Sequence, residues 1–350
     1  MSKWQPVKLN DCCASISDGD HQAPPKSTSG IPFVTISNID SYNSLDFSNV
    51  MYVPQEYYDK LDNKRKAQPG DIIYSVVGSF GIPVLIKNDI PFVFQRHIAI
   101  LKPNNTIDSR FLYYSMLSKD FYHKADAVAI GAAQRTISLT ALRNLEISLP
   151  PLEVQRKIAD ILSAYDDLIE NNRKQIKLLE EAAQRLYKEW FIDLRFPGHE
   201  DTPVVNGLPD GWEKKKLVEI ADIIMGQSPK SEFYNSNHDG LPFHQGVGSY
   251  GVRFVIDETY SSSFTRIAEA GDILFSVRAP VGRLNITLNK IAIGRGLAAI
   301  KHKNNLQSFL YYMLKEHFFK DDIIGNVSIF ASITIDELTN FFLLVPRQDI

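Results

Sequence analysis

Apolar residues between positions 152 and 193 recur at alternating steps of four and three, with Lys, Glu, Gln and Ala between them and no glycine or proline. This period predicts one long helix from Leu152 to about Asp193, which begins directly after Pro150 and Pro151. The pattern is typical of a coiled coil. We name its apolar row the seam, and it comprises Val154, Ile158, Ile161, Tyr165, Leu168, Asn172, Ile176, Leu179, Ala183, Leu186 and Trp190.

One step of the seam, from Asn172 to Ile176, breaks the alternation. We interpret it as a stutter that locally unwinds the supercoil, with Asn172 as a polar residue that sets the register. Because such a seam needs another helix to cover it, the helix predicts a partner.

Short apolar runs outside the helix predict strands. The runs GDIIYSVV at 70–77 and GDILFSVR at 271–278 are rich in β-branched and aromatic residues, and each begins with a Gly-Asp turn. The stretch from Phe111 to Lys124 has the length and aromatic spacing of a helix. The mixture predicts an α+β protein with compact α/β domains of roughly 140 residues.

The two strand runs belong to a repeat that extends over most of the chain. GIPF at 30–33 returns as GLPF at 240–243, QRHIAILK at 95–102 as GRGLAAIK at 294–301, and FLYY at 111–114 again at 309–312. TISLTALRNLEISLP at 136–150 matches SITIDELTNFFLLVP at 332–346. The order of the blocks is kept, which predicts two similar domains at 1–150 and 205–350, joined by a helical segment at 151–197.

Composition limits the function. The net charge of −3 argues against a globally basic, non-specific nucleic-acid binder, so any contact with DNA must come from local patches. Cys12 and Cys13 are adjacent and form neither a disulfide framework nor a CxxC zinc site. No apolar run reaches the roughly 20 residues that a membrane span needs, and no signal peptide is evident. We expect a cytoplasmic protein with no membrane partner.

These blocks together resemble the specificity (S) subunit of type I restriction-modification systems. The resemblance rests on the W-x-x-x-x-L openings at Trp4 and Trp212, the GIPF-like turns, the P-G-D-[IL]-L-[FY]-S-like blocks, and the spacer PLEVQRKIADIL that begins at Pro151. It covers nearly the whole chain. The resemblance implies two target-recognition domains joined by a coiled-coil-type helix, each domain recognising one half of a bipartite target in double-stranded DNA.

The resemblance also implies partners. Two modification (methyltransferase) subunits would dock on the helix, and restriction subunits can join them. S-adenosylmethionine, ATP and Mg²⁺ would act in those partners, so no cofactor and no metal is expected on this chain. The helix of about 40 residues would span roughly 60 Å, which is enough to hold two domains on half-sites one helical turn apart.

One departure from the family pattern concerns the end of the second copy. After Pro346 a second, distal helix is expected, and the sequence stops at Ile350. With no distal helix to cover it, the seam would be covered by another chain, and we predict self-association as a homodimer through Leu152 to Trp190. An alternative function is a truncated decoy that binds modification subunits without productive DNA recognition.

Candidate DNA contacts are basic side chains for phosphates, and arginine forks or amides for base edges. The loops that differ between the copies are favoured for sequence-specific contacts. Arg96 and His97 lie in a repeated block and therefore have a structural explanation as well. The candidates of the first domain are His21, Gln22, Lys26, Ser79, Arg96, His97, Gln134, Arg135 and Thr136, and those of the second are Gln245, Tyr250, Arg253, Arg278, Arg283 and Arg295.

Two clusters have a structural explanation that we favour over a functional one. The run Lys214–Lys216 suits a solvated strand edge better than a phosphate site. The tyrosine pairs at 113–114 and 311–312 recur at one repeat position, which favours core packing over stacking on extruded bases.

Catalysis by this chain is disfavoured. Methylation of DNA amines needs an N-P-P-[FY]-like motif and a glycine-rich cofactor turn, and ATP hydrolysis needs G-x-x-x-x-G-K-[ST]. Neither set is present in the sequence. We therefore predict a non-catalytic subunit.

Overall fold

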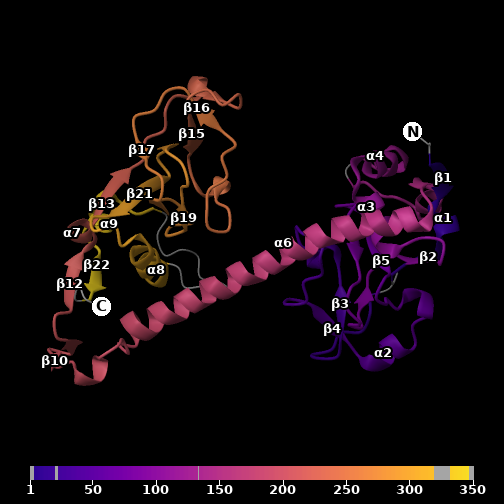
Figure 1. The fold of residues 1–350 in the computed structure, drawn as a ribbon, viewed down its shortest axis with the longest axis horizontal. Coiled ribbons are helices and arrows are strands. Elements are labelled where there is room, and N and C mark those ends of the chain that lie inside the picture. The colour runs from indigo at the N-terminus through magenta and orange to yellow at the C-terminus, as the bar shows by residue number, and fades with distance from the viewer. Residues whose placement is uncertain (1–3, 20–22, 133, 319–331, 347–350) are drawn as a thin grey trace. The chain divides into compact units, whose positions relative to one another are not determined.

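A computed structural model describes residues 4–19, 23–132, 134–318 and 332–346. The chain divides into two compact units, unit 1 (Met1–Lys174) and unit 2 (Gln175–Ile350). Both combine short strands with helices, and one long helix runs between the two sets of strands (Figure 1). The predicted α+β class is confirmed.

Unit 1 contains most of its strands before residue 104 and most of its α-helices, including the start of α6, after it. The elements are β1 Gln5–Lys8, α1 Leu9–Cys12, β2 Cys13–Asp18, β3 Ile31–Val34, η1 Ile36–Asn38, β4 Met51–Val53, α2 Gln55–Asp59, η2 Asn63–Arg65, β5 Ile72–Ser75, β6 Pro83–Leu85, β7 Val93–Phe94, β8 Ile98–Pro103, α3 Ser109–Leu117, α4 Lys119–Val128, α5 Leu139–Asn144 and β9 Glu146–Leu149.

The main sheet of unit 1 has the order β2-β8-β5-β6, and all of its neighbours are antiparallel. A smaller sheet has the order β4-β3-β7, in which β3 and β7 are parallel. Strands β1 and β9 form a separate antiparallel pair. One face of the main sheet buries Tyr74 and Leu101 against α3 and α4, and the other buries Ile73 and Ile100.

Unit 2 begins in the last turns of the long helix. Its further elements are a π-helical turn Lys188–Ile192, η4 His199–Asp201, β10 Val204–Val205, β11 Leu208–Pro209, β12 Glu213–Lys216, α7 Leu217–Ile220, β13 Ala221–Met225, η5 Ser231–Phe233, β14 Tyr234–Asn235, β15 Leu241–His244, η6 Val247–Ser249, β16 Tyr260–Ser261, β17 Ile267–Ala268, β18 Ile273–Ser276, β19 Leu284–Ile286, β20 Ile291–Ile293, β21 Leu297–His302, α8 Gln307–Phe318, α9 Ile335–Thr339 and β22 Phe342–Val345.

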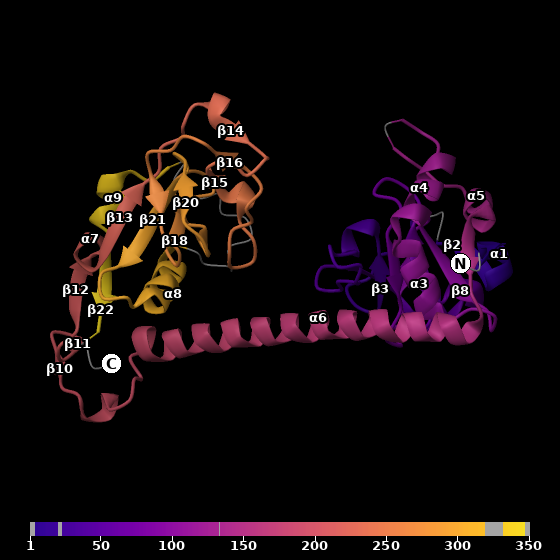
Figure 2. The same cartoon turned by 45° about the horizontal axis from the view of Figure 1, so that its top comes forward.

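The topology of unit 2 repeats that of unit 1. Its main sheet has the order β13-β21-β18-β19, its second sheet the order β14-β16-β15-β20-β17 with β15 and β20 parallel, and β12 pairs with β22. Helix α8 covers the main sheet as α3 does in unit 1 (Figure 2). The predicted internal repeat is thus a repeat of the fold.

The Gly-Asp turn that begins β5 and β18 has the same construction in both units. Gly70 and Gly271 have positive φ angles of 93° and 88°, a conformation that glycine adopts without steric cost. The carboxylate of Asp71 accepts a hydrogen bond from the Gln68 N–H at 2.8 Å, and that of Asp272 accepts one from Glu269 at 2.9 Å. The backbone conformation and the hydrogen bond of this turn therefore explain why glycine and aspartate recur at these two positions.

The long helix, α6, is continuous from Leu152 to Tyr187 and passes through Asn172 without a break. Its first turns belong to the unit 1 core, where Ala159 is fully buried and the Gln155 amide donates to the Pro150 carbonyl at 2.9 Å. Beyond these turns most of the seam is exposed, including Ile161, Tyr165, Leu168, Ile176, Leu179 and Leu186.

The prediction of a single helix from Phe111 to Lys124 is wrong, because the helix is interrupted at Ser118. This residue is extended, with φ −66° and ψ 146°, and it ends α3 and begins α4. Its hydroxyl accepts a hydrogen bond from the Phe121 N–H at 3.2 Å. A serine cap of this kind satisfies a free N–H at the new helix start, so it stabilises two helices in place of one.

The two clusters with a structural explanation lie as favoured. Tyr113 and Tyr311 are buried in the cores of their units, and Lys214 lies exposed on β12, at the edge formed with β22. Within the described ranges no helix is both long and apolar enough to cross a membrane.

Candidate nucleic-acid interface

A parallel strand pair brings two loops to one edge of the second sheet in unit 2. Strands β15 and β20 pair with Phe243 opposite Ala292, and the Gly294 N–H donates to the His244 carbonyl at 2.8 Å. Because the carboxyl ends of parallel strands meet at the same edge, the loops that follow them lie together. Gln245 follows β15 and Arg295 follows β20.

A third loop, which follows β18, joins this edge. The Val277 N–H donates to the Gly296 carbonyl at 2.9 Å, which places Arg278 beside Arg295. A hollow of about 210 Å³ is lined by Gln245, Arg278 and Arg295 together, and a neighbouring hollow of about 490 Å³ by both arginines. The structure thus unites three of the predicted contacts, which we name the unit 2 loop surface.

The electrostatics of the unit 2 loop surface favour an anion. Gln245, Arg278 and Arg295 are exposed, and no carboxylate of the described chain forms an ion pair with either arginine. The described residues that line the two hollows include no Asp or Glu. Two guanidinium groups without a counter-charge at one hollow suit a phosphate or an electron-rich base edge.

Glycines make the close approach of these loops feasible. A Cβ atom on Gly296 would lie 2.3 Å from the Gln245 carbonyl oxygen, and one on Gly294 would lie 3.0 Å from the Gln245 Cα. Close contact between the two loops therefore explains the glycines on both sides of Arg295. The same contact fixes the backbone position of Arg295.

His244 supports the loop from below. Its imidazole is buried, with Nδ1 at 2.7 Å from the Ser249 hydroxyl and Nε2 at 2.9 Å from the Asp257 carboxylate. Burial lowers the pKa of His244, and the neighbouring Asp257 opposes that shift. The residue stabilises the turn that carries Gln245.

Unit 1 builds the same edge from β3, β7 and β5. Strands β3 and β7 are parallel, and the Gln95 N–H donates to the Val34 carbonyl at 3.2 Å. The Val76 N–H donates to the His97 carbonyl at 2.9 Å, and the Gly78 N–H to the Arg135 carbonyl at 2.9 Å. These loops carry three exposed candidates, Ser79, Arg96 and Gln134. We name these three residues the unit 1 loop surface.

The other described candidates in the unit 1 loops have partners within the protein. The Arg135 guanidinium contacts the Asp126 carboxylate at 2.5 Å, and the backbone of Thr136 bridges to Val77 and Ile130. The His97 ring lies 2.5 Å from the Gln95 amide. These contacts hold the loops in place. Lys26 is exposed on a separate segment, and His21 and Gln22 lie outside the described residues.

Three candidates of unit 2 do not line the two hollows of its loop surface. Arg253 forms an ion pair with Glu180 of α6, and its guanidinium lies 4.7 Å from the centre of the Tyr311 ring. The Tyr250 hydroxyl donates to the Leu274 carbonyl at 3.0 Å. Arg283 lines a different hollow of about 310 Å³, together with Tyr250.

Both units hold α6 with the second tyrosine of FLYY, a role that the prediction of core packing for these tyrosines did not include. The Tyr114 hydroxyl donates to Asp166 at 2.8 Å, and the Tyr312 hydroxyl donates to Glu180 at 2.9 Å. We name these two pairs the tyrosine anchors. The signal was present in the repeated FLYY and in the acidic residues between the seam positions.

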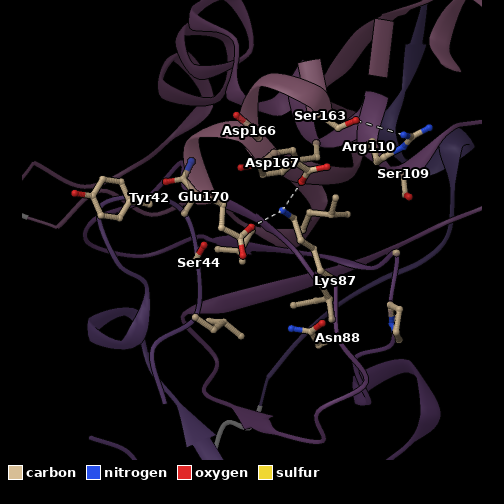
Figure 3. A pocket seen from close by; sticks show the side chains of 18 of the residues that line it. Tyr42, Ser44, Lys87, Asn88, Ser109, Arg110, Ser163, Asp166, Asp167 and Glu170 are labelled. Atoms are coloured by element: carbon tan, nitrogen blue, oxygen red, sulfur yellow. Dashed lines mark hydrogen bonds and ion pairs between the residues drawn. The ribbon is translucent and has the colours of Figure 1, made fainter. Parts of the chain in front are cut away.

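A hollow of about 810 Å³ lies in unit 1 beside α6 (Figure 3). Its charges neutralise one another: Lys87 lies 3.5 Å from Asp167 and 3.2 Å from Glu170. Lys174 and Lys87 lower the pKa of Glu170. None of the predicted DNA contacts line this hollow, so we assign its polar groups to fastening the domain to the helix.

Comparison with known proteins finds two matched segments, one in each half of the chain. A model of the type I restriction modification DNA specificity domain family matches residues 1–181 and 209–349. The chain belongs to this family.

Two relatives of this specificity chain come from Methanocaldococcus jannaschii. A protein named as the type I restriction enzyme MjaX specificity subunit is 32% identical over an alignment of 360 positions, which covers 98% of this chain and 83% of that protein. The type I restriction enzyme MjaIX specificity subunit is 26% identical over 339 residues, covering 91% and 77%. The predicted resemblance to type I specificity subunits is confirmed.

A solved structure supports the fold of the specificity chain. The crystal structure of a type I restriction-modification S subunit from M. genitalium has a TM-score of 0.62 at 18% identity, and the match covers 98% of this chain and 85% of that one. Each family match includes one parallel strand pair and its loops, so both loop surfaces lie within specificity domains.

Proposed function

We propose that this chain is the DNA-recognition subunit of a type I restriction-modification complex, in which each unit recognises one half of a bipartite target. The observation that carries the proposal is the unit 2 loop surface, where Arg278 and Arg295 line one hollow whose described lining residues include no Asp or Glu. It lies in a fold of the specificity family and has a counterpart around Arg96 in unit 1.

The proposal assigns no chemistry to the chain. Among the described residues, no group of three or more His, Cys, Asp or Glu side chains is arranged to hold a metal ion. Methyl transfer, which uses S-adenosylmethionine, and DNA cleavage, which uses ATP and Mg²⁺, belong in this proposal to modification and restriction subunits. The chain would act with them in the cytoplasm.

We further propose that α6 is the docking site of the modification subunits. The exposed seam residues, such as Ile161, Leu168 and Leu179, form an apolar row that a partner helix would cover. A second copy of this chain is an alternative occupant. A dimer in sedimentation at micromolar concentration, lost in Leu168→Glu, would favour self-association, and a monomer that binds the methyltransferase would favour docking.

Methylome sequencing of cells that carry this chain and its methyltransferase tests the proposal. We expect one split motif with two modified adenines, separated by a spacer of fixed length. Cells that carry Arg278→Gln in place of the native chain are the matched comparison, and they should show an altered or weaker motif in one half. Association with the methyltransferase in the absence of any methylated motif would contradict DNA recognition and favour a decoy.

A further inference from the structure

The two loop surfaces share one arginine and differ in the rest. Arg96 and Arg295 are each the second residue after a parallel strand, which ends at Phe94 in unit 1 and at Ile293 in unit 2. In contrast, the position of Arg278 is occupied in unit 1 by Val77, and the position of Gln245 by Thr35. The arginine at 96 and 295 is therefore common to both units, whereas Arg278 and Gln245 occur in unit 2 alone.

The shared arginines have the same surroundings. In unit 2 the backbone on either side of Arg295 is fixed by the Gly294 N–H to His244 at 2.8 Å and by the Leu297 N–H to Gly294 at 3.0 Å. In unit 1 the equivalent bonds, from Gln95 to Val34 and from Ile98 to Gln95, measure 3.2 and 3.0 Å. Each arginine is exposed and has no ion pair among the described residues.

A charge that is fixed identically in both units suits a feature that both half-sites have in common. The sugar-phosphate backbone is such a feature, since its charge does not depend on sequence. The bases are not, because two domains with different loops are expected to recognise different half-sites. The repeated position of Arg96 and Arg295 therefore points to phosphate contacts.

The side chains particular to unit 2 suit base edges. The forked guanidinium of Arg278 matches the O6 and N7 acceptors of guanine, and the Gln245 amide matches N6 and N7 of adenine. Both side chains are exposed at the same hollow of about 210 Å³, so both can reach one segment of a groove. Arg295 lines that hollow beside them, and a phosphate contact there would orient the pair.

Resting on the proposed function, we infer that Arg96 and Arg295 are phosphate anchors, whereas Arg278 and Gln245 are base-recognising residues of unit 2. The two classes differ in what a conservative change does. Lysine retains a point charge for a phosphate and loses the planar fork that recognises guanine.

Binding of the chain in complex with its methyltransferase tests the assignment, using a duplex with the methylated bipartite motif and a scrambled duplex of equal length. Titrations would run from about 50 to 200 mM salt. Arg96→Gln and Arg295→Gln should weaken both duplexes by the same factor and lower the salt slope by about 0.9 each. Arg295→Lys should restore both properties.

Arg278→Lys and Arg278→Gln should instead reduce discrimination at one base pair of the unit 2 half-site by roughly tenfold to a hundredfold. Arg278→Lys should leave binding of the scrambled duplex unchanged. Lys214→Gln is the matched control, because it removes one exposed positive charge from β12, outside the loops, and it should change neither the slope nor the discrimination.

Loss of base discrimination in Arg295→Lys would overturn the assignment, and so would equal weakening of both duplexes by Arg278→Lys. Circular dichroism of each variant identifies a folding defect, and the Lys variants, which keep size and charge, then decide the question. A wild-type complex that binds both duplexes equally would contradict the proposed function itself. Clear preference for the motif with variants that contradict the expected pattern would overturn only the present inference.

Discussion

Units 1 and 2 have the same strand order and differ at the residues that emerge from it. Both bury an equivalent leucine, Leu142 and Leu338, and both bind α6 through a tyrosine anchor. At the loop edge, however, unit 1 has Val77 where unit 2 has Arg278. The shared strands fix the backbone position of each loop residue, while the identity of that residue determines what its side chain can bind.

The largest expected effect comes from truncating a core leucine in one unit only. Leu338→Ala removes a fully buried side chain of unit 2 and should lower the free energy of unfolding of that unit by about 3 kcal/mol. Two of the three tryptophans, Trp190 and Trp212, belong to unit 2, and Trp4 of unit 1 is already exposed, so tryptophan fluorescence during urea unfolding should report chiefly the loss in unit 2. Leu142→Ala should leave this transition in place, and an equal shift there would contradict separate unfolding of the units.

The tyrosine anchors should differ in strength. Glu180 binds the charged Arg253 as well as Tyr312, and both members of the ion pair are about one quarter exposed, whereas Asp166 accepts from the neutral Tyr114. We expect Glu180→Gln to destabilise unit 2 by about 2 kcal/mol, and Asp166→Asn to destabilise unit 1 by about 1 kcal/mol.

Hydrogen exchange of amides in α8 and α3 measures these two losses within one molecule. The matched control is Glu181→Gln, since Glu181 contacts only the exposed Arg185, at 3.8 Å, among the partners found for it. A larger loss for Asp166→Asn than for Glu180→Gln would show that the charged contact adds nothing to the anchor.

A smaller effect comes from a hydroxyl that only unit 1 carries. Tyr74 is fully buried on β5, and no hydrogen-bond partner of its hydroxyl is found in the described chain, whereas Phe275 occupies the equivalent position of β18. Tyr74→Phe should stabilise unit 1 by about 1 kcal/mol, because it removes an unsatisfied buried polar atom. Slower exchange of the β5 and β8 amides would verify this, and faster exchange would reveal a partner for the hydroxyl.

The smallest expected effect is a dependence on pH. Burial depresses the pKa of His244 in the folded state, with Asp257 opposing, so the folded state disfavours the proton that the unfolded chain takes up below its usual pKa of about 6.5. Stability from this group is therefore complete above about pH 6.5 and declines as the pH falls through the lower, folded pKa.

Unit 1 has Val34 at the position of His244, so His244→Val should reduce the loss of unit 2 stability between pH 7.5 and 5.5, with tryptophan fluorescence as the probe. His302 is also buried in unit 2, and burial lowers its pKa, so part of the dependence should persist. An unchanged pH dependence in His244→Val would assign the whole effect to His302 or other groups.

Local patterns predicted the elements, and long-range packing decided the site. The strand runs at 72–75 and 273–276 and the helix at 152–187 follow from periodicity over adjacent residues. The break at Ser118 was missed because the aromatic spacing continues through it, although serine is a favoured helix cap. The partners of Arg135 and Arg253, Asp126 and Glu180, depend on how distant segments pack, and no spacing reveals them.

The parallel strand pairs could not be predicted from the sequence, because they too depend on the packing of distant segments. Strand β7 has two residues, and β3 lies about 60 positions earlier in the chain, so neither its alternation nor its spacing points to the other. Arg295 was therefore a candidate from the sequence only as one of the four candidate arginines of the second domain. Its neighbours Gln245 and Arg278 emerged once β15 and β20 were seen side by side.

The backbone bridge that holds the loop after the third main-sheet strand has the same form in both halves of the molecule, from Val77 to Thr136 and from Arg278 to Ser332. Main-chain atoms make this bridge, so the side chain at 77 or 278 carries none of its strength. A lineage can therefore replace that side chain by point mutation and inherit an intact fold. Under the proposed function, its descendants would recognise a different DNA sequence and keep the same methyltransferase and restriction subunits.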